Sequence, residues 1–175
     1  MAARRALTLA SLLAASFPSP AGVGSASFTA ITSVHTNCRV STTPVLFGRY
    51  DPIVANKAAG LNANGAITVA CVKGTAPTIA LGPGVSASGS TRRMRLLFGD
   101  DFLVYELYQP PSSVPGIACA YPGVLVWGSA GANLFSAAGA PSKNARTYQV
   151  CGTVTAGQNP RIGIYADLVV ATVNF

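Results

Sequence analysis

The pattern that most limits the possible folds is the alternation of apolar side chains over short runs separated by turn residues. Residues 66–71 alternate in this way, and the turn signal Asn64-Gly65 comes directly before them. Further strand-like runs occupy residues 78–81, 93–97, 102–108, 124–127, 146–154 and 164–175. Many short strands with frequent turns are typical of a β-sandwich or barrel. We therefore predict an all-β chain that forms one sandwich.

Two of the runs have features that bear on their place in a sheet. Residues 38–47 are extended but contain Pro44, which suits an edge strand or a switch between sheets. In residues 164–175 the side chains divide between two faces. Val169, Ala171, Val173 and Phe175 share one face, and Leu168, Val170, Thr172 and Asn174 share the other.

Charged residues are scarce and mostly basic. They make up 10% of the 175 residues, with 12 Lys and Arg against 5 Asp and Glu. This excludes a coiled coil and an acidic disordered tail. The basic residues are scattered apart from Arg92, Arg93 and Arg95, whereas nucleic-acid-binding proteins concentrate them on one face. We attribute the net charge of +7 to solubility and expect no nucleic-acid partner.

The first 26 residues have the composition of a secretory signal peptide. Arg4 and Arg5 precede a short apolar stretch at residues 6–17, and small residues follow up to Ala26. The apolar stretch is shorter than the ~20 residues that a membrane-spanning helix needs. We expect residues 1–26 to be cleaved and the mature chain to be exported without a membrane span.

Four cysteines are then free to form disulfides in an oxidising compartment. They are Cys38, Cys71, Cys119 and Cys151, and four cysteines allow three pairings. Sequence order suggests Cys38 with Cys71 and Cys119 with Cys151, but order alone leaves the other pairings open. None of the four has the spacing of a zinc ligand, so we predict no metal site.

Candidate catalytic groups are few. His35 lies outside the core strands and no nucleophile motif accompanies it, so we interpret it as an exposed bystander. Asp100 and Asp101 follow Gly99 and are expected to shape a turn. A glycosidase needs two carboxylates facing one pocket, and only Glu106 with Asp167 offers that possibility. We predict that the chain is no enzyme and binds no cofactor.

Three aromatic residues leave two interpretations open. Tyr105, Tyr108 and Trp127 either line a sugar-binding surface or pack within the core. We favour core packing, because aromatic residues that alternate along strands usually face the interior.

Several segments, in order along the chain, resemble the spore coat protein U domain family. The most specific are residues 38–52 (CRVSTTPVLFGRYDP) and 163–175 (GIYADLVVATVNF). Shorter matches are residues 65–71, Arg93-Met94, residues 103–108, residues 126–128, Gly152 and residues 156–158. Cys119 and Cys151 are additions to the cysteine pair that resembles the family's, and we interpret them as a second bridge.

The resemblance implies a structural subunit of an extracellular archaic chaperone–usher pilus. Such subunits are incomplete immunoglobulin-like β-sandwiches, each completed by a donor strand from a neighbouring subunit. The implied partners are identical or homologous subunits, a periplasmic chaperone and an outer-membrane usher, and the implied route runs through the periplasm to the cell surface. The alternative is a secreted adhesin or coat module that binds through surface aromatic residues.

The resemblance also assigns parts of the chain. Residues 27–37 would be the donor segment and residues 38–175 the pilin-like domain. The donor side chains facing the acceptor groove would be Phe28, Ala30, Thr32 and Val34, with Ile31 off that face. The groove, which the chaperone would occupy first, would be lined by Val169, Ala171, Val173 and Phe175.

Overall fold

The computed structural model describes residues 23–175, so most of the predicted signal peptide lies outside the described residues. The chain divides into two units, Met1–Ser33 and Val34–Phe175. Residues 23–37 contain neither helix nor strand, although the alternation at residues 28–34 is that of a strand. Phe28 is 92% exposed and Val34 is 78% exposed. In this structure no residue of the predicted donor segment belongs to a strand.

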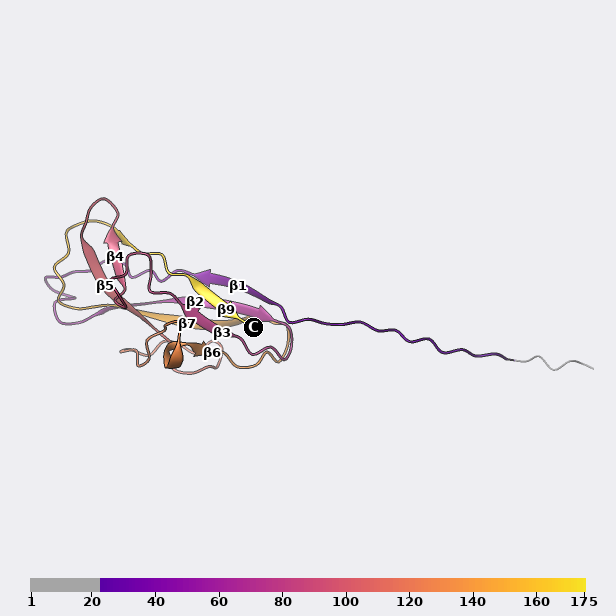
Figure 1. Ribbon diagram of the computed structural model, residues 1–175. Coiled ribbons are helices and arrows are strands. Elements are labelled where there is room, and N and C mark those ends of the chain that lie inside the picture. Colours follow the sequence, from indigo (N-terminus) through magenta and orange to yellow (C-terminus); the bar gives the residue numbers. More distant parts are fainter. Residues whose placement is uncertain (1–22) are drawn as a thin grey trace, which may run out of the picture. The chain divides into compact units, whose positions relative to one another are not determined.

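The second unit contains nine strands and one 3₁₀ turn, η1 (Gly131–Asn133). The strands are β1 (Cys38–Thr43), β2 (Leu61–Cys71), β3 (Thr78–Leu81), β4 (Arg93–Leu96), β5 (Phe102–Tyr108), β6 (Phe135–Ser136), β7 (Arg146–Val154), β8 (Tyr165–Ala166) and β9 (Ala171–Asn174). They form a six-stranded sheet in the order β1-β2-β7-β5-β4-β8 and a three-stranded sheet in the order β6-β3-β9, shown in Figure 1. The predicted all-β sandwich is confirmed, and every ladder is antiparallel.

The core follows from the period-two patterns. In β5 the side chains of Leu103, Tyr105 and Leu107 are buried while those between them are half-buried. Trp127 is completely buried, its ring packs 4.9 Å from that of Phe135, and its indole N–H donates to the Ile79 carbonyl oxygen at 2.8 Å. Its backbone N–H donates to the Leu107 carbonyl oxygen of β5 at 2.8 Å, so Trp127 links the three-stranded sheet to the six-stranded one.

The predicted turn at Asn64-Gly65 is wrong. Strand β2 continues through both residues, which pair with Cys151 and Val150 of β7. The Asn64 amide donates to the Gln149 side chain at 2.9 Å, so this residue serves as a cross-strand partner. A Cβ on Gly65 would lie 2.6 Å from the Thr43 carbonyl oxygen. Glycine is needed there for the close approach of β1, which a turn preference cannot reveal.

Two other predicted strands are modified. Residues 124–127 contribute just one isolated bridge, Tyr108 with Val126, in which the Gln109 N–H donates to the Leu125 carbonyl oxygen and the Trp127 N–H donates to that of Leu107. Residues 164–175 divide into β8 and β9, which belong to different sheets. The predicted alternation nevertheless continues through the break, since Asp167 and Val169 are half-buried and their neighbours are exposed.

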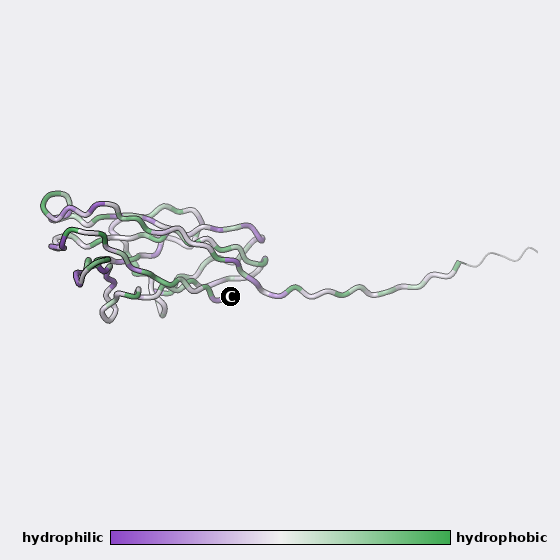
Figure 2. Tube along the Cα trace, turned by 90° about the horizontal axis from the view of Figure 1, so that it is seen from above, coloured by the Kyte–Doolittle hydropathy of each residue, from purple (hydrophilic) through white to green (hydrophobic). Residues whose placement is uncertain are grey.

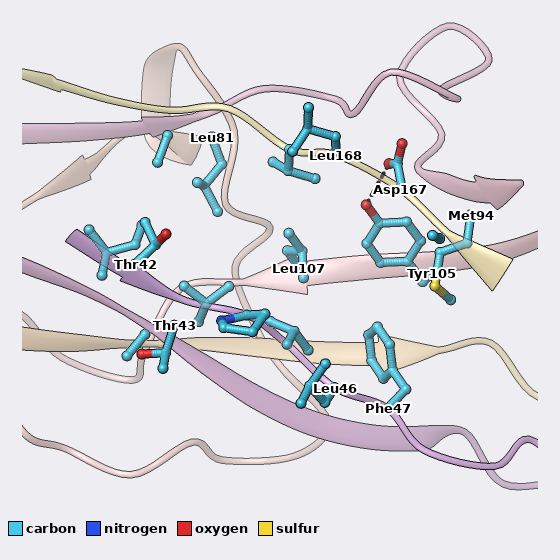
Figure 3. A pocket seen from close by; sticks show the side chains of 18 of the residues that line it. Thr42, Thr43, Leu46, Phe47, Leu81, Met94, Tyr105, Leu107, Asp167 and Leu168 are labelled. Atoms are coloured by element: carbon cyan, nitrogen blue, oxygen red, sulfur yellow. Dashed lines mark hydrogen bonds between the residues drawn. The ribbon is translucent and has the colours of Figure 1, made fainter. Parts of the chain in front are cut away.

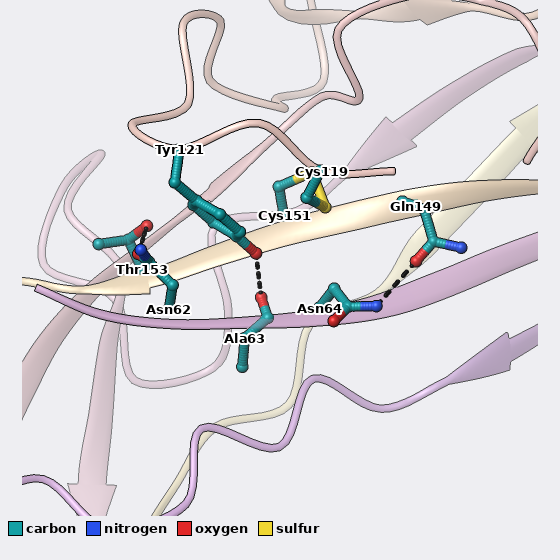
Figure 4. Close-up of a disulfide and its surroundings, with 8 residues drawn as sticks. All are labelled: Asn62, Ala63, Asn64, Cys119, Tyr121, Gln149, Cys151 and Thr153. Atoms are coloured by element: carbon teal, nitrogen blue, oxygen red, sulfur yellow. Dashed lines mark hydrogen bonds between the residues drawn. A yellow bond between two sulfur atoms is a disulfide. The ribbon is translucent and has the colours of Figure 1, made fainter. Parts of the chain in front are cut away.

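Both disulfides have the pairing that sequence order suggests. Cys38–Cys71 joins the start of β1 to the end of β2, and Cys119–Cys151 ties the long loop after β5 to β7. Figure 4 shows this second bridge beside Tyr121, whose hydroxyl donates to the Ala63 carbonyl oxygen at 2.7 Å. The loop is therefore held at two places against the β2–β7 pair. Within residues 23–175, no helix is long and apolar enough to cross a membrane.

Candidate functional site: a groove between unpaired edge strands

The sheet order leaves a groove with strand β1 on one side and strands β8 and β9 on the other. β1 and β8 are the outer strands of the six-stranded sheet, and β9 is an outer strand of the other sheet. Among the described residues no ladder joins β1 to β8 or to β9. A cavity of about 420 Å³ lies between these edges, as Figure 3 shows.

The groove has two walls and an apolar floor. Residues 42–47 form the first wall and residues 165–171 form the second. The floor is made by core side chains, chiefly Ile67, Leu81, Leu107 and Val150. Any side chain that enters the groove therefore meets the hydrophobic core directly.

The first wall consists of the last two residues of β1 and the chain that continues beyond its ladder. Pro44 has no N–H to donate, and β1 ends at the residue before it. Val45 and Phe47 then pack over Gly152, where a Cβ would lie 2.7 Å from the Phe47 ring. The Phe47 ring also contacts that of Tyr105, with centroids 5.9 Å apart. A glycine in β7 thus allows the wall to lie close to the sheet.

The second wall is attached to the rest of the domain through alternate residues. The carbonyl oxygens of Leu168 and Val170 accept hydrogen bonds from the backbone of Val85 and Gly82. In an extended chain the main-chain groups of successive residues point to opposite sides. Those of Asp167 and Val169 therefore point to the groove side of the wall, as an edge strand's unpaired groups do.

One polar contact lies within the groove. The Tyr105 hydroxyl donates to Asp167 Oδ2 at 2.7 Å, and the backbone N–H of Ser86 donates to Asp167 Oδ1 at 3.0 Å. Burial is the main cause that raises the pKa of Tyr105, and the hydrogen bond to the Asp167 carboxylate is the second. Tyr105 accordingly remains a protonated donor, and this pair fixes residue 167 against β5.

The structure places two of the four residues predicted to line an acceptor groove beside this cavity. Val169 and Ala171 line it, whereas Val173 packs against the core and Phe175 is 55% exposed outside the lining. The first wall and the Tyr105–Asp167 contact were missed. The alternation that selects Val169 and Ala171 also includes Asp167. Following the same face towards the N-terminus would therefore have placed Asp167 in the groove.

The alternative chemical sites are not assembled in the described structure. Glu106 forms an ion pair with the buried Arg92, and it follows Tyr105 in β5, so the two side chains point to opposite faces. Glu106 and Asp167 therefore do not face one pocket. No group of three or more His, Cys, Asp or Glu within residues 23–175 could hold a metal ion.

Arg92, Arg93, Tyr105 and Trp127 make structural contacts within the domain. Arg92 is buried and donates to the carbonyl oxygens of Gly82 and Trp127, so its charge does not serve solubility as predicted. Arg93 lies 4.1 Å from the Phe102 ring centroid. Burial of Tyr105 and Trp127 confirms their predicted core packing and removes them from any surface site for sugar. Asp101 accepts from the N–H of Phe102, as expected of a residue shaping this turn.

Comparison with known proteins agrees with the architecture. The model of the Spore Coat Protein U domain matches residues 25–172. Protein U of Myxococcus xanthus is 34% identical over 184 residues, covering 97% of this chain and 95% of that protein.

A solved structure with a similar fold comes from Acinetobacter baumannii. It is the CsuC–CsuE chaperone–tip adhesion subunit pre-assembly complex from archaic chaperone–usher Csu pili. The TM-score is 0.57 at 22% identity, over 81% of this chain and 40% of that chain. Because this chain spans 40% of its length, that likeness supports the fold alone. The family match and the relative together show that the chain belongs to the spore coat protein U domain family.

Proposed function

We propose that this protein is a structural subunit of an extracellular chaperone–usher pilus and polymerises by donor-strand complementation. The observation that carries the proposal is the apolar groove whose two walls are both unpaired edges. An inserted strand would hydrogen-bond to the walls and place alternate side chains on the core floor.

The donor is the segment before Cys38. Its side chains Phe28 and Val34 are exposed in the structure, which is costly for large apolar groups unless another surface covers them. Burying each would contribute about 1.5–3 kcal/mol before ordering costs. Phe28, Ala30, Thr32 and Val34 would face the groove of a neighbouring copy.

This contact is head-to-tail, since the donating segment and the accepting groove are different surfaces. A heterologous contact that does not close on itself produces a filament. Until a subunit's groove is filled, its apolar floor requires temporary cover. A periplasmic chaperone would supply that cover, and exchange at an outer-membrane usher would replace it with the next donor.

Two further features support an exported subunit. The N-terminal 26 residues have the composition of a signal peptide. Both disulfides join segments more than 30 residues apart, with sequence separations of 33 and 32, and such bridges persist in the periplasm and outside the cell.

The direct test is co-expression with a chaperone and usher of the archaic pathway, followed by electron microscopy for fibres. Deletion of residues 27–36 should leave a subunit that still binds the chaperone but does not donate to a neighbour. Val124→Ser serves as the control, because Val124 is exposed and lies outside both groove and donor. Normal fibres from the deletion variant would overturn the proposal.

A further inference from the structure

Three loops at one end of the domain expose large apolar side chains. Leu61 and Tyr105 both pair with Val154, so the loops before β2, before β5 and after β7 meet at the same end. In Figure 2 apolar colouring reaches a loop at the end far from the C-terminus. We call this set the apolar end; it comprises Ile53, Val54, Leu97, Phe98, Ile162 and Ile164. Phe98 is 96% exposed, and exposed groups of this kind mark interaction surfaces.

These side chains are presented by braced loops. Asp51 Oδ1 accepts from the backbone N–H of Ile53 and of Val54, which holds that turn in place. Behind it, the buried Asn56 accepts at its carbonyl oxygen from the Gly157 N–H.

The other two loops are tied to each other. Leu97 N–H donates to the Ile164 carbonyl oxygen at 2.9 Å, and Arg161 N–H donates to Asp101 Oδ2. The apolar end is therefore a preformed surface that pays little ordering entropy on docking.

The apolar end adjoins one end of the groove. Ile164 directly precedes Tyr165, the first residue of the second wall. On the other side, residues 42–47 run towards the turn at Asp51. A strand that leaves the groove at this end must pass over the apolar end.

The direction of the inserted donor follows from the two walls. The first wall contains Pro44, which lacks an N–H, so the second wall offers the more complete ladder. Antiparallel pairing is the more stable arrangement per residue. A donor antiparallel to residues 165–171 has its last inward residue, Val34, beside Tyr165.

The tether between donor and body is short. Cys38 is bound to Cys71, and the Asn37 carbonyl oxygen accepts from Val72 N–H, so the chain is fixed from residue 37 onward. From Val34 to Cys38 the chain spans at most about 14 Å, at roughly 3.3–3.6 Å per residue. We call the end of the domain that holds the Cys38–Cys71 bridge the Cys38 end. The donating copy must therefore place its Cys38 end close to the apolar end of the accepting copy.

We infer that the apolar end of each copy docks on the Cys38 end of the next copy, which makes a second body-to-body contact at every junction. This inference rests on the proposed function. Asn174 pairs with Thr78 at the same end of the domain as the Cys38–Cys71 bridge, so the C-terminal residue Phe175 lies at the Cys38 end. Phe175 is exposed there, and Figure 1 labels this C-terminus. Phe175 is the natural partner for Phe98.

The test uses fibres assembled in cells from the full chain with its chaperone and usher. In the double variant Phe98→Cys with Phe175→Cys, a short bismaleimide should link neighbouring copies. A ladder of covalent oligomers should then survive denaturation. The matched control is Val124→Cys with Phe175→Cys, which places an equally exposed thiol away from the apolar end and should yield no ladder.

A second variant avoids added thiols. Phe98→Ser with Ile162→Ser should still polymerise, because the groove and donor are intact, but its fibres should bend more sharply in electron micrographs. If fibres of the Phe98→Cys with Phe175→Cys variant yield no ladder, or if the double serine variant leaves fibre stiffness unchanged, this inference alone is overturned. Absence of any wild-type fibre overturns the proposed function instead.

Discussion

Supplying the donor within the same chain should stabilise the domain substantially. The change moves residues 27–36 from the N-terminus to a position after Phe175, joined by a short flexible linker. A donor antiparallel to residues 165–171 begins near Ala171, and β9 connects that residue to the C-terminus. The linker therefore has a short distance to cover.

The groove sets the size of the effect. An enclosed cavity costs about 24 cal/mol per Å³, so 420 Å³ corresponds to an upper limit of about 10 kcal/mol. The groove is open to water, which lowers that figure. Burial of Phe28 and Val34 alone contributes about 3–6 kcal/mol. We expect the free energy of unfolding to rise by about 3–6 kcal/mol.

Urea unfolding followed by the fluorescence of the buried Trp127 measures this change. Two substitutions in the relocated donor give a matched comparison. Phe28→Ser should remove about 2 kcal/mol of the gain, whereas Ile31→Ser should cost under about 0.5 kcal/mol because Ile31 faces away from the groove.

Two results would refute the reasoning. The first is an unfolding midpoint that does not differ from that of the domain without the donor. The second is a cost for Ile31→Ser as large as that for Phe28→Ser, which would mean that the opposite face of the donor enters the groove.

Three other perturbations test the structure. Replacing Cys119 and Cys151 together by Ser should lower the free energy of unfolding by about 3–4 kcal/mol, as closure of a loop of 32 residues predicts; a urea midpoint within error of wild type would contradict this. Arg92→Met should cost about 3 kcal/mol by calorimetry, because it leaves Glu106 without its partner, and Glu106→Gln should cost less since Arg92 keeps its carbonyl acceptors. Hydrogen bonds from the Arg161 backbone, then from Tyr165 and Phe102, lower the pKa of Asp101 from 3.8. The contribution of Asp101 to the free energy of unfolding is therefore fully present above pH 3.8 and is lost as the pH falls through the lowered pKa of the folded state. Asp101→Asn should consequently be less stable than wild type at pH 7, and the difference in thermal midpoint should narrow below pH 3.8; a constant difference would exclude this origin.

Local pattern was sufficient where a strand has the same environment along its length. Strands β3, β5 and β7 begin and end at the predicted residues, since each presents buried side chains to one continuous core. Pattern failed where a partner decides the outcome. Gly65 continues a strand because β1 approaches it closely, and Pro44 terminates β1 beside the groove.

The groove shows the same division. Alternation in the last run of the chain identified Val169 and Ala171, because one face of that run is apolar throughout. It did not reveal the first wall, which is more than 100 residues away in the sequence, or the contact of Tyr105 with Asp167, which needs two separate strands side by side.

The amino-acid sequence by itself determined the all-β class, the positions of the main strands and the absence of a recognisable catalytic motif, because these depend on the order and type of neighbouring residues. Tertiary structure alone decided which strands remain without a partner. An edge is defined by the strand that is missing beside it, and that depends on how all nine strands are ordered in space.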